Sequence, residues 1–174
     1  ETSSLTCYAC ARKFPVIRGI PRFVASDSYA RSFSWEWLLN QETQLAKRIG
    51  EAYQVFDFEM RSGLKVNKPP GLALEGGCGA GRHSDLLARN GWKIISVDLS
   101  MSVESAYKNL KGYEDVLVVQ ADLNSLPLKR DSIDAIFSLG VIHHTPSPRQ
   151  SFASLRRHLR PGGTMSVSVY SNEG

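Results

Sequence analysis

Two aspartates and a glycine-rich turn stand at spacings that suit the binding of a nucleoside. The turn contains Gly77, Gly79 and Gly81, and residues without a side chain let the backbone bend tightly and lie against a ligand. Asp98 comes 21 residues after Gly77, where a carboxylate can accept hydrogen bonds from both ribose hydroxyls. Asp122 can meet the edge of an adenine ring. Each residue alone is equally consistent with a turn or a cap, but together they predict a nucleoside-containing ligand.

The glycine turn, Asp98 and Asp122 can meet one ligand only if the strands that precede them lie side by side in one sheet. Short apolar runs predict five strands, at 72–74, 93–97, 116–119, 133–138 and 165–169. The glycine turn follows the first run, and Asp98 and Asp122 follow the second and the third. Strands that alternate with helices at this spacing predict βαβ units, and therefore an α/β fold with a parallel sheet covered on both faces.

Helical patterns separate the predicted strands and cover 82–89, 100–110 and 148–159. Ser100 is the expected N-cap of the second helix. The third helix is expected to bury Phe152, Leu155 and Leu159 and to end at the Pro-Gly-Gly of 161–163.

The glycine spacing distinguishes between two kinds of nucleoside ligand. A dinucleotide fingerprint would place its third glycine at the position of Arg82, but this chain has Gly81 one residue earlier. The motif is therefore Glu75-x-Gly77-x-Gly79-x-Gly81. This spacing argues against a nicotinamide-dependent oxidoreductase, which is kept as an alternative.

With this motif the chain resembles the class I S-adenosylmethionine-dependent methyltransferases of the small UbiE-like kind, methyltransferase type 11. The matching segments are 74–82, 97–100, 120–127, 132–145 and 159–163, in order and with the family's spacing. The resemblance covers about residues 71–170. It implies a Rossmann-like, doubly wound, mostly parallel sheet, and transfer of a methyl group to an acceptor by in-line displacement.

The resemblance also implies which residues hold S-adenosylmethionine. Glu75 stands where the family carries an acid that helps to fix the methionine end, and Ser138 would offer its backbone to the methionine amine. Asp98 would bind the ribose hydroxyls and Asp122 the adenine amino group. The other members of the implied cofactor site are Gly77, Cys78, Gly79, Leu99, Ala121 and Leu123.

His143 and His144 are the candidate catalytic residues, because they follow the fourth strand at the mouth of the expected cofactor site. Either imidazole could remove a proton from the acceptor as a general base. The alternative is that this His-His-Thr segment shapes the pocket without moving a proton.

Cys7 and Cys10 form a C-x-x-C that, with the residues after it, resembles the second half of a zinc ribbon found ahead of some of these methyltransferases. A structural zinc site needs four ligands, so the other pair would lie upstream of Glu1. Zinc is expected as a second cofactor only if that pair exists. The alternatives are an idle cysteine pair and a redox pair.

Three regions are expected along the chain: residues 1–25 as a partial zinc-ribbon-like appendage, 26–68 as a helical cap, and 69–174 as the methyltransferase core. The cap rests on the helical spacing of apolar residues within 34–60, from Trp35 to Tyr53. The core is expected to be incomplete after the fifth strand, which would leave one edge of the sheet unpaired and available for a homodimer.

Composition sets the remaining bounds. The chain has 174 residues, a formal net charge of +4 and scattered basic residues, which permits RNA as a partner without arguing for it. No apolar run reaches the roughly 18–20 residues that a membrane helix needs, and three cysteines in this pattern suggest a cytoplasmic setting. A small molecule is the expected methyl acceptor. RNA, and a non-catalytic module that binds S-adenosylmethionine, are the alternatives.

Overall fold

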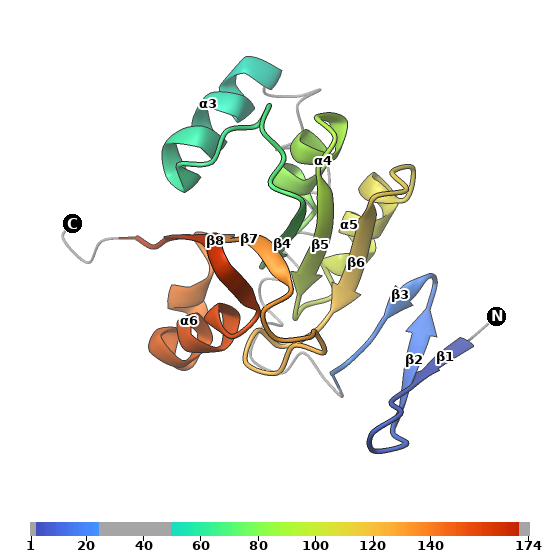
Figure 1. The fold of residues 1–174 in the computed structure, drawn as a ribbon. Helices are drawn as coiled ribbons and strands as arrows, with labels where there is room; N and C mark the ends of the chain where they lie inside the picture. The colour runs from blue at the N-terminus through green and yellow to red at the C-terminus, as the bar shows by residue number, and fades with distance from the viewer. Residues whose placement is uncertain (1–2, 25–49, 171–174) are drawn as a thin grey trace.

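Five parallel strands form the main sheet of the protein. The computed structural model, drawn in Figure 1, describes residues 3–24 and 50–170. The sheet has the order β6-β5-β4-β7-β8, with every neighbouring pair parallel. Its strands are β4 (Leu72–Gly76), β5 (Lys93–Asp98), β6 (Val116–Gln120), β7 (Ile133–Leu139) and β8 (Leu159–Ser168). The predicted α/β fold is confirmed. Because the order reverses beside β4, a switch point lies between β4 and β7, where such sheets bind ligands.

Helices cover both faces of the sheet (Figure 1). They are α3 (Glu51–Ser62), α4 (Arg82–Arg89), α5 (Val103–Leu110), α6 (Pro148–Arg156) and the short 3-10 helix η2 (Ile142–His144). On one face, Phe58 of α3 packs in a cluster with Ala73 and Phe137 of the sheet. On the other face, Leu155 of α6 packs with Leu74, the next residue along β4. Successive strand residues point to opposite faces, so the apolar runs of the strands serve two cores.

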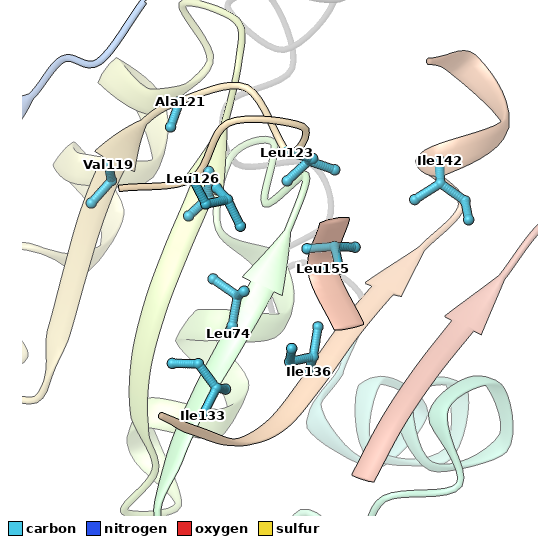
Figure 2. Packing of buried hydrophobic residues seen from close by; sticks show 10 residues of the cluster. Leu74, Val119, Ala121, Leu123, Leu126, Ile133, Ile136, Ile142 and Leu155 are labelled. Carbon is cyan, nitrogen blue, oxygen red and sulfur yellow. The ribbon is translucent and has the colours of Figure 1, made fainter. Parts of the chain in front are cut away.

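The core beneath α6 lies under the ends of the strands that carry the predicted site. Figure 2 shows Leu74 and Ile136 on the side of the sheet that Leu155 covers, with Leu123 above them on the loop after β6. Ala121 belongs to the same cluster and is completely buried. The loop after β6 is therefore held in place by the core.

The predicted helix boundaries are confirmed in part. The helix over 82–89 has the predicted bounds, whereas α5 begins at Val103 and its N-cap is Ser102. The prediction that Ser100 caps this helix is wrong, because its hydroxyl bonds to Asp98 and Ser102 instead.

The third predicted helix is shorter than expected. Helix α6 ends at Arg156, and Leu159 opens β8. Phe152 is 43% exposed, so the prediction that it is buried is wrong. The buried positions of α6 are Ser151, Ser154 and Leu155, and Phe152 lies about 100° further round from Ser151.

The predicted helical cap falls largely on residues 25–49, which lie outside the described residues. The remainder forms α3, which is a helix as predicted but buries Gln54, Phe58 and Ser62. Tyr53, expected on the apolar face, is 58% exposed. The i, i+4, i+8 spacing of the buried residues places Tyr53 outside their stripe.

The N-terminal segment forms a small antiparallel sheet of β1 (Ser3–Thr6), β2 (Lys13–Ile17) and β3 (Ile20–Pro21). Ile20 is fully buried against Val103 and Ala106 of α5 and Val118 of β6. The small sheet therefore shares a core with the large one.

At the opposite edge, β8 has β7 as its only strand partner within the described residues. Pairing of the other edge of β8 by a second copy of the chain stays a prediction. Among the helices of the described residues, none is both long and apolar enough to cross a membrane.

Candidate functional site

The glycine turn after β4 is packed closely on both sides. The N–H groups of Gly77 and Cys78 donate to the carbonyl oxygen of Val97 at 2.8 and 2.9 Å, which ties the turn to β5. Gly77 has φ +81°, and a Cβ there would lie 2.4 Å from a methyl of Val141. Gly81 has φ +85°, and its Cβ would meet Leu110 at 2.7 Å. Any side chain at these two positions would clash and strain the backbone.

Asp98 joins the glycine turn to the loop after β5. Its Oδ2 accepts the N–H of Gly79 at 2.9 Å, and its Oδ1 accepts the N–H and hydroxyl of Ser100 at 2.9 and 2.7 Å. An ionised carboxylate offers about four acceptor positions, so the three bonds leave capacity for one more donor. The carboxylate is therefore held in a fixed orientation and can still receive a ligand hydroxyl.

Asp122 lies beside this loop at the end of β6. Its Oδ1 accepts the backbone and side-chain N–H groups of Asn124 at 2.8 and 3.0 Å. Its Oδ2 has no hydrogen-bond partner within the described residues. The N–H of Ala121 donates to the carbonyl oxygen of Asp98 at 3.0 Å. The structure thus brings Gly79, Asp98 and Asp122 together, as the strand ends predicted, and within residues 3–24 and 50–170 it leaves Oδ2 of Asp122 without a partner.

Glu75 is 3% exposed and is bonded inside the protein. Its Oε1 lies 3.0 Å from Nδ1 of His83, and its Oε2 accepts the hydroxyl of Ser84 at 2.5 Å. Ser84 also bonds Ser96 of β5 at 2.6 Å. Glu75 therefore fixes the first turn of α4 against the sheet, and its role at a bound methionine end stays a prediction.

The partners of Glu75 were not predicted from the sequence. Nε2 of His83 lies 2.8 Å from Arg82, whose Nη2 also lies 3.2 Å from Asp57 of α3. The chain Asp57-Arg82-His83-Glu75 thus connects α3 to the glycine turn. The polar pair that directly follows the third glycine of the motif was a usable signal for a buried network.

The side chains of Ser138 and Cys78 are buried and make their contacts inside the protein. Ser138 is completely buried, and its hydroxyl donates to the carbonyl oxygen of Gly76 at 2.8 Å. Burial, and secondarily the charges of Asp98 and Glu75, raise the pKa of the Cys78 thiol well above its usual range. Cys78 is therefore a protonated thiol that packs beside Ile20 rather than a nucleophile.

His143 and His144 lie on η2 with their ring centroids 3.9 Å apart, and the ring of Tyr170 lies 4.6 Å from His143. Both nitrogens of His143 are buried without a hydrogen-bond partner in the described part of the chain. Burial, and secondarily the charge of His144, lower the pKa of His143 below 6.5. A neutral imidazole with an unpaired nitrogen can accept a proton or a hydrogen bond. His144, in contrast, is exposed to solvent.

We expect His143 to titrate below pH 6.5 in a nuclear magnetic resonance titration, with its signal assigned by the variant His143→Gln. The unfolded chain binds this proton more readily than the folded chain does. The stability contributed by a neutral His143 is therefore present above pH 6.5 and lost as the pH falls. His143→Gln should reduce this acid sensitivity. A titration midpoint at or above 6.5 would contradict the assignment.

Cys7 and Cys10 stay apart from the site on the small N-terminal sheet. Nε of Arg12 donates to the sulfur of Cys10 at 3.3 Å, and this hydrogen bond is the main cause that lowers the pKa of Cys10 to about 7. No group of three or more His, Cys, Asp or Glu side chains suited to a metal occurs among the described residues. The zinc site stays a prediction that needs further ligands.

Comparison with known proteins agrees with this geometry. The sequence pattern of a family described as "Methyltransferase domain" matches residues 74–167. A tRNA U34 carboxymethyltransferase of Methylococcus capsulatus is 30% identical over 130 residues, which cover 68% of this chain and 40% of that protein. The chain spans between 30% and 40% of the length of the first curated relatives it matches.

Solved structures share the fold. A SAM-dependent methyltransferase from Aquifex aeolicus aligns with a TM-score of 0.54 and 23% identity over 62% of each chain. The glycopeptide N-methyltransferase MtfA, solved with S-adenosyl-L-methionine, aligns with a TM-score of 0.54 and 22% identity over 66% of this chain and 48% of that one. The family pattern covers the glycine turn, both aspartates and η2, more than half of the sequence, and the chain belongs to the methyltransferase domain family.

Proposed function

We propose that this protein transfers a methyl group from S-adenosylmethionine to a small-molecule acceptor. The observation that carries the proposal is the position of Asp98, whose carboxylate is bonded at once to the glycine turn and to the loop after β5. The ends of β4, β5 and β6 lie at one edge of the sheet. They supply the backbone of the glycine turn, the oriented carboxylate of Asp98 and the Oδ2 atom of Asp122, in that order. This donor and acceptor set fits an adenosine group, and the glycine spacing, with Arg82 where a dinucleotide motif needs its third glycine, argues against a dinucleotide.

Within this proposal each residue has a stated task. Asp98 accepts one ribose hydroxyl at its remaining acceptor position, and Oδ2 of Asp122 accepts the adenine amino group, with Ala121 and Leu123 beside the ring. When bound, S-adenosylmethionine supplies a methyl group already activated by the sulfonium.

His143 is the proposed proton acceptor on the acceptor side of the site. Its lowered pKa keeps it neutral at physiological pH, and its buried nitrogens lie beside Tyr170. A small acceptor whose nucleophile carries a proton would need such a base. If His143 is the base, His143→Asn should lose turnover with acceptors that must give up a proton and keep it with acceptors that need no deprotonation. An equal effect on both kinds of acceptor would show that His143 shapes the pocket instead.

The test is transfer of label from methyl-labelled S-adenosylmethionine to a panel of phenols, amines and carboxylic acids, with unfractionated tRNA in parallel. The proposal expects label in a small molecule and none in tRNA. Binding of S-adenosylhomocysteine without transfer to any acceptor would favour the non-catalytic module.

A second candidate function, methylation of RNA, is favoured by one surface feature. A depression of about 470 Å³ beside the start of β7 and β8 is lined by Arg130, Arg156, Arg157 and Arg160, together with the acidic Asp131. Arg160 pairs with Asp134 at 2.7 Å, while the other three form no ion pair within the described residues. Guanidinium groups bind phosphates well, and one relative is described as a tRNA-modifying enzyme.

If RNA is the acceptor, tRNA binding should weaken steeply with salt, and the variant Arg130→Gln/Arg156→Gln/Arg157→Gln should flatten that dependence. Each lost phosphate contact should reduce the slope of log K against log salt by roughly 0.7–0.9. Fluorescence anisotropy with labelled tRNA measures both. If the slope is the same in the variant and in wild type, the arginines of this depression do not bind the RNA phosphates.

A further inference from the structure

The small N-terminal sheet touches the large sheet at the place where the adenosine edge begins. We use "adenosine edge" for residues 98–101 and 120–122, which carry Asp98 and Asp122. Arg22, just after β3, pairs with Gln120 in a parallel bridge, and the N–H of Phe23 donates to the carbonyl oxygen of Gln120 at 2.8 Å. The N-terminal segment thus continues the large sheet beyond β6.

The side chain of Arg22 connects the parts of this edge. It is only 7% exposed. Its Nη1 donates to Oε1 of Gln120 at 2.7 Å and lies 3.7 Å from the sulfur of Met101, and its Nη2 bonds Glu104 of α5. Gln120 in turn donates to the carbonyl oxygen of Leu99 at 2.9 Å. One guanidinium therefore holds the end of β6, the loop after β5 and the start of α5.

A buried cation has a high cost unless its partners are fixed around it. Both Nη atoms of Arg22 have a fixed partner, an amide and a carboxylate, while its Nε is buried without a hydrogen-bond partner among the described residues. The two partners lie within six residues of Asp98 or two residues of Asp122. Leu99 directly follows Asp98, so a shift of its carbonyl group would move the carboxylate. The clamp consists of Arg22, Gln120 and Glu104.

We propose that Arg22 is a positioning residue for the cofactor: the N-terminal sheet, through this clamp, holds the adenosine edge in its binding geometry. The inference rests on the proposed function, because it assigns the adenosine group to this edge. It gives the N-terminal segment a task that does not depend on a metal at Cys7 and Cys10.

The test compares two arginines that share one partner. Arg18 also contacts Glu104, at 3.6 Å, but its side chain is 76% exposed. Arg22→Met removes the clamp and keeps the apolar stem, whereas Arg18→Met removes a solvent-exposed charge. Titration calorimetry with S-adenosylhomocysteine, well below the unfolding temperature, should show about tenfold weaker binding for Arg22→Met. This corresponds to a binding-competent population reduced to about a tenth. Arg18→Met should change the affinity by less than about twofold.

A second readout needs no ligand. Amide hydrogen exchange of the ligand-free chain should accelerate at residues 98–102 in Arg22→Met and stay unchanged in Arg18→Met. Wild-type affinity and unaltered exchange in a folded Arg22→Met would overturn the proposal, even if the variant melts at a lower temperature. If Arg22→Met does not fold, Gln120→Met cuts the same chain of hydrogen bonds while keeping Glu104 paired, and must show both effects.

Failure of the clamp and failure of the proposed function give different results. If wild type does not bind S-adenosylhomocysteine, the proposed function fails, while the exchange experiment still decides whether Arg22 orders the edge. If wild type binds and both readouts of Arg22→Met match it, the clamp alone is wrong.

Discussion

Replacing Asp98 by Ala should weaken the binding of S-adenosylhomocysteine by at least roughly a hundredfold, about 3 kcal/mol. The carboxylate is the proposed acceptor for a ribose hydroxyl, and hydrogen bonds to a charged acceptor are among the stronger ones. The substitution also releases Gly79 and Ser100, which Asp98 now holds from both sides. Titration calorimetry of the folded variant measures the loss.

Two further variants isolate the cause. Asp98→Asn keeps the volume but places an amide N–H opposite either Gly79 or Ser100, both of which donate, so it should bind little better than Asp98→Ala. Asp115→Ala removes an equal charge from an exposed position beside Lys93 and should leave affinity within about twofold. Wild-type affinity in a folded Asp98→Ala would show that the ligand lies elsewhere.

The largest stability effect is expected at Phe58. This residue of α3 is completely buried, and its ring contacts those of Phe137, His83 and Trp92 at centroid distances of 5.3, 5.8 and 6.2 Å. Phe58→Ala should lower the free energy of unfolding by about 3–5 kcal/mol through lost burial and a cavity. Denaturant unfolding followed by circular dichroism measures the change.

Phe56 is the matched control, since it lies on the same helix with 63% of its surface exposed. Phe56→Ala should change the stability by no more than about 0.5 kcal/mol. Equal effects of the two substitutions would show that α3 does not pack on the sheet through Phe58. Because Asp57 reaches Arg82 beside the glycine turn, Phe58→Ala should also reduce cofactor affinity.

Much of the fold could be predicted because the strand pattern is strong. The run at 93–97 is followed by a single charged residue, so β5 and the place of Asp98 at its end were predicted correctly. Boundaries that depend on a single side chain were less predictable. Ser100 has the residue type of a cap, but the nearby carboxylate of Asp98 takes its hydroxyl instead.

The buried residues and side-chain contacts that were not predicted from the sequence depend on tertiary packing. Gln54 carries no apolar signal, yet the docking of α3 buries it while Tyr53 faces outward. The bonds of Glu75 to His83 and Ser84 bring together residues eight and nine positions apart across a turn. The contact of Arg22 with Gln120 spans 98 residues, a distance over which no local pattern carries information.

The most direct test of the central claim is a calorimetric titration of the wild-type chain with S-adenosylhomocysteine and, separately, with NAD. The oriented carboxylate of Asp98 predicts micromolar binding of S-adenosylhomocysteine at one site, and the glycine spacing that ends at Gly81 predicts no heat from NAD. Binding of NAD with no response to S-adenosylhomocysteine would contradict the account and would favour an oxidoreductase site at the same strand ends.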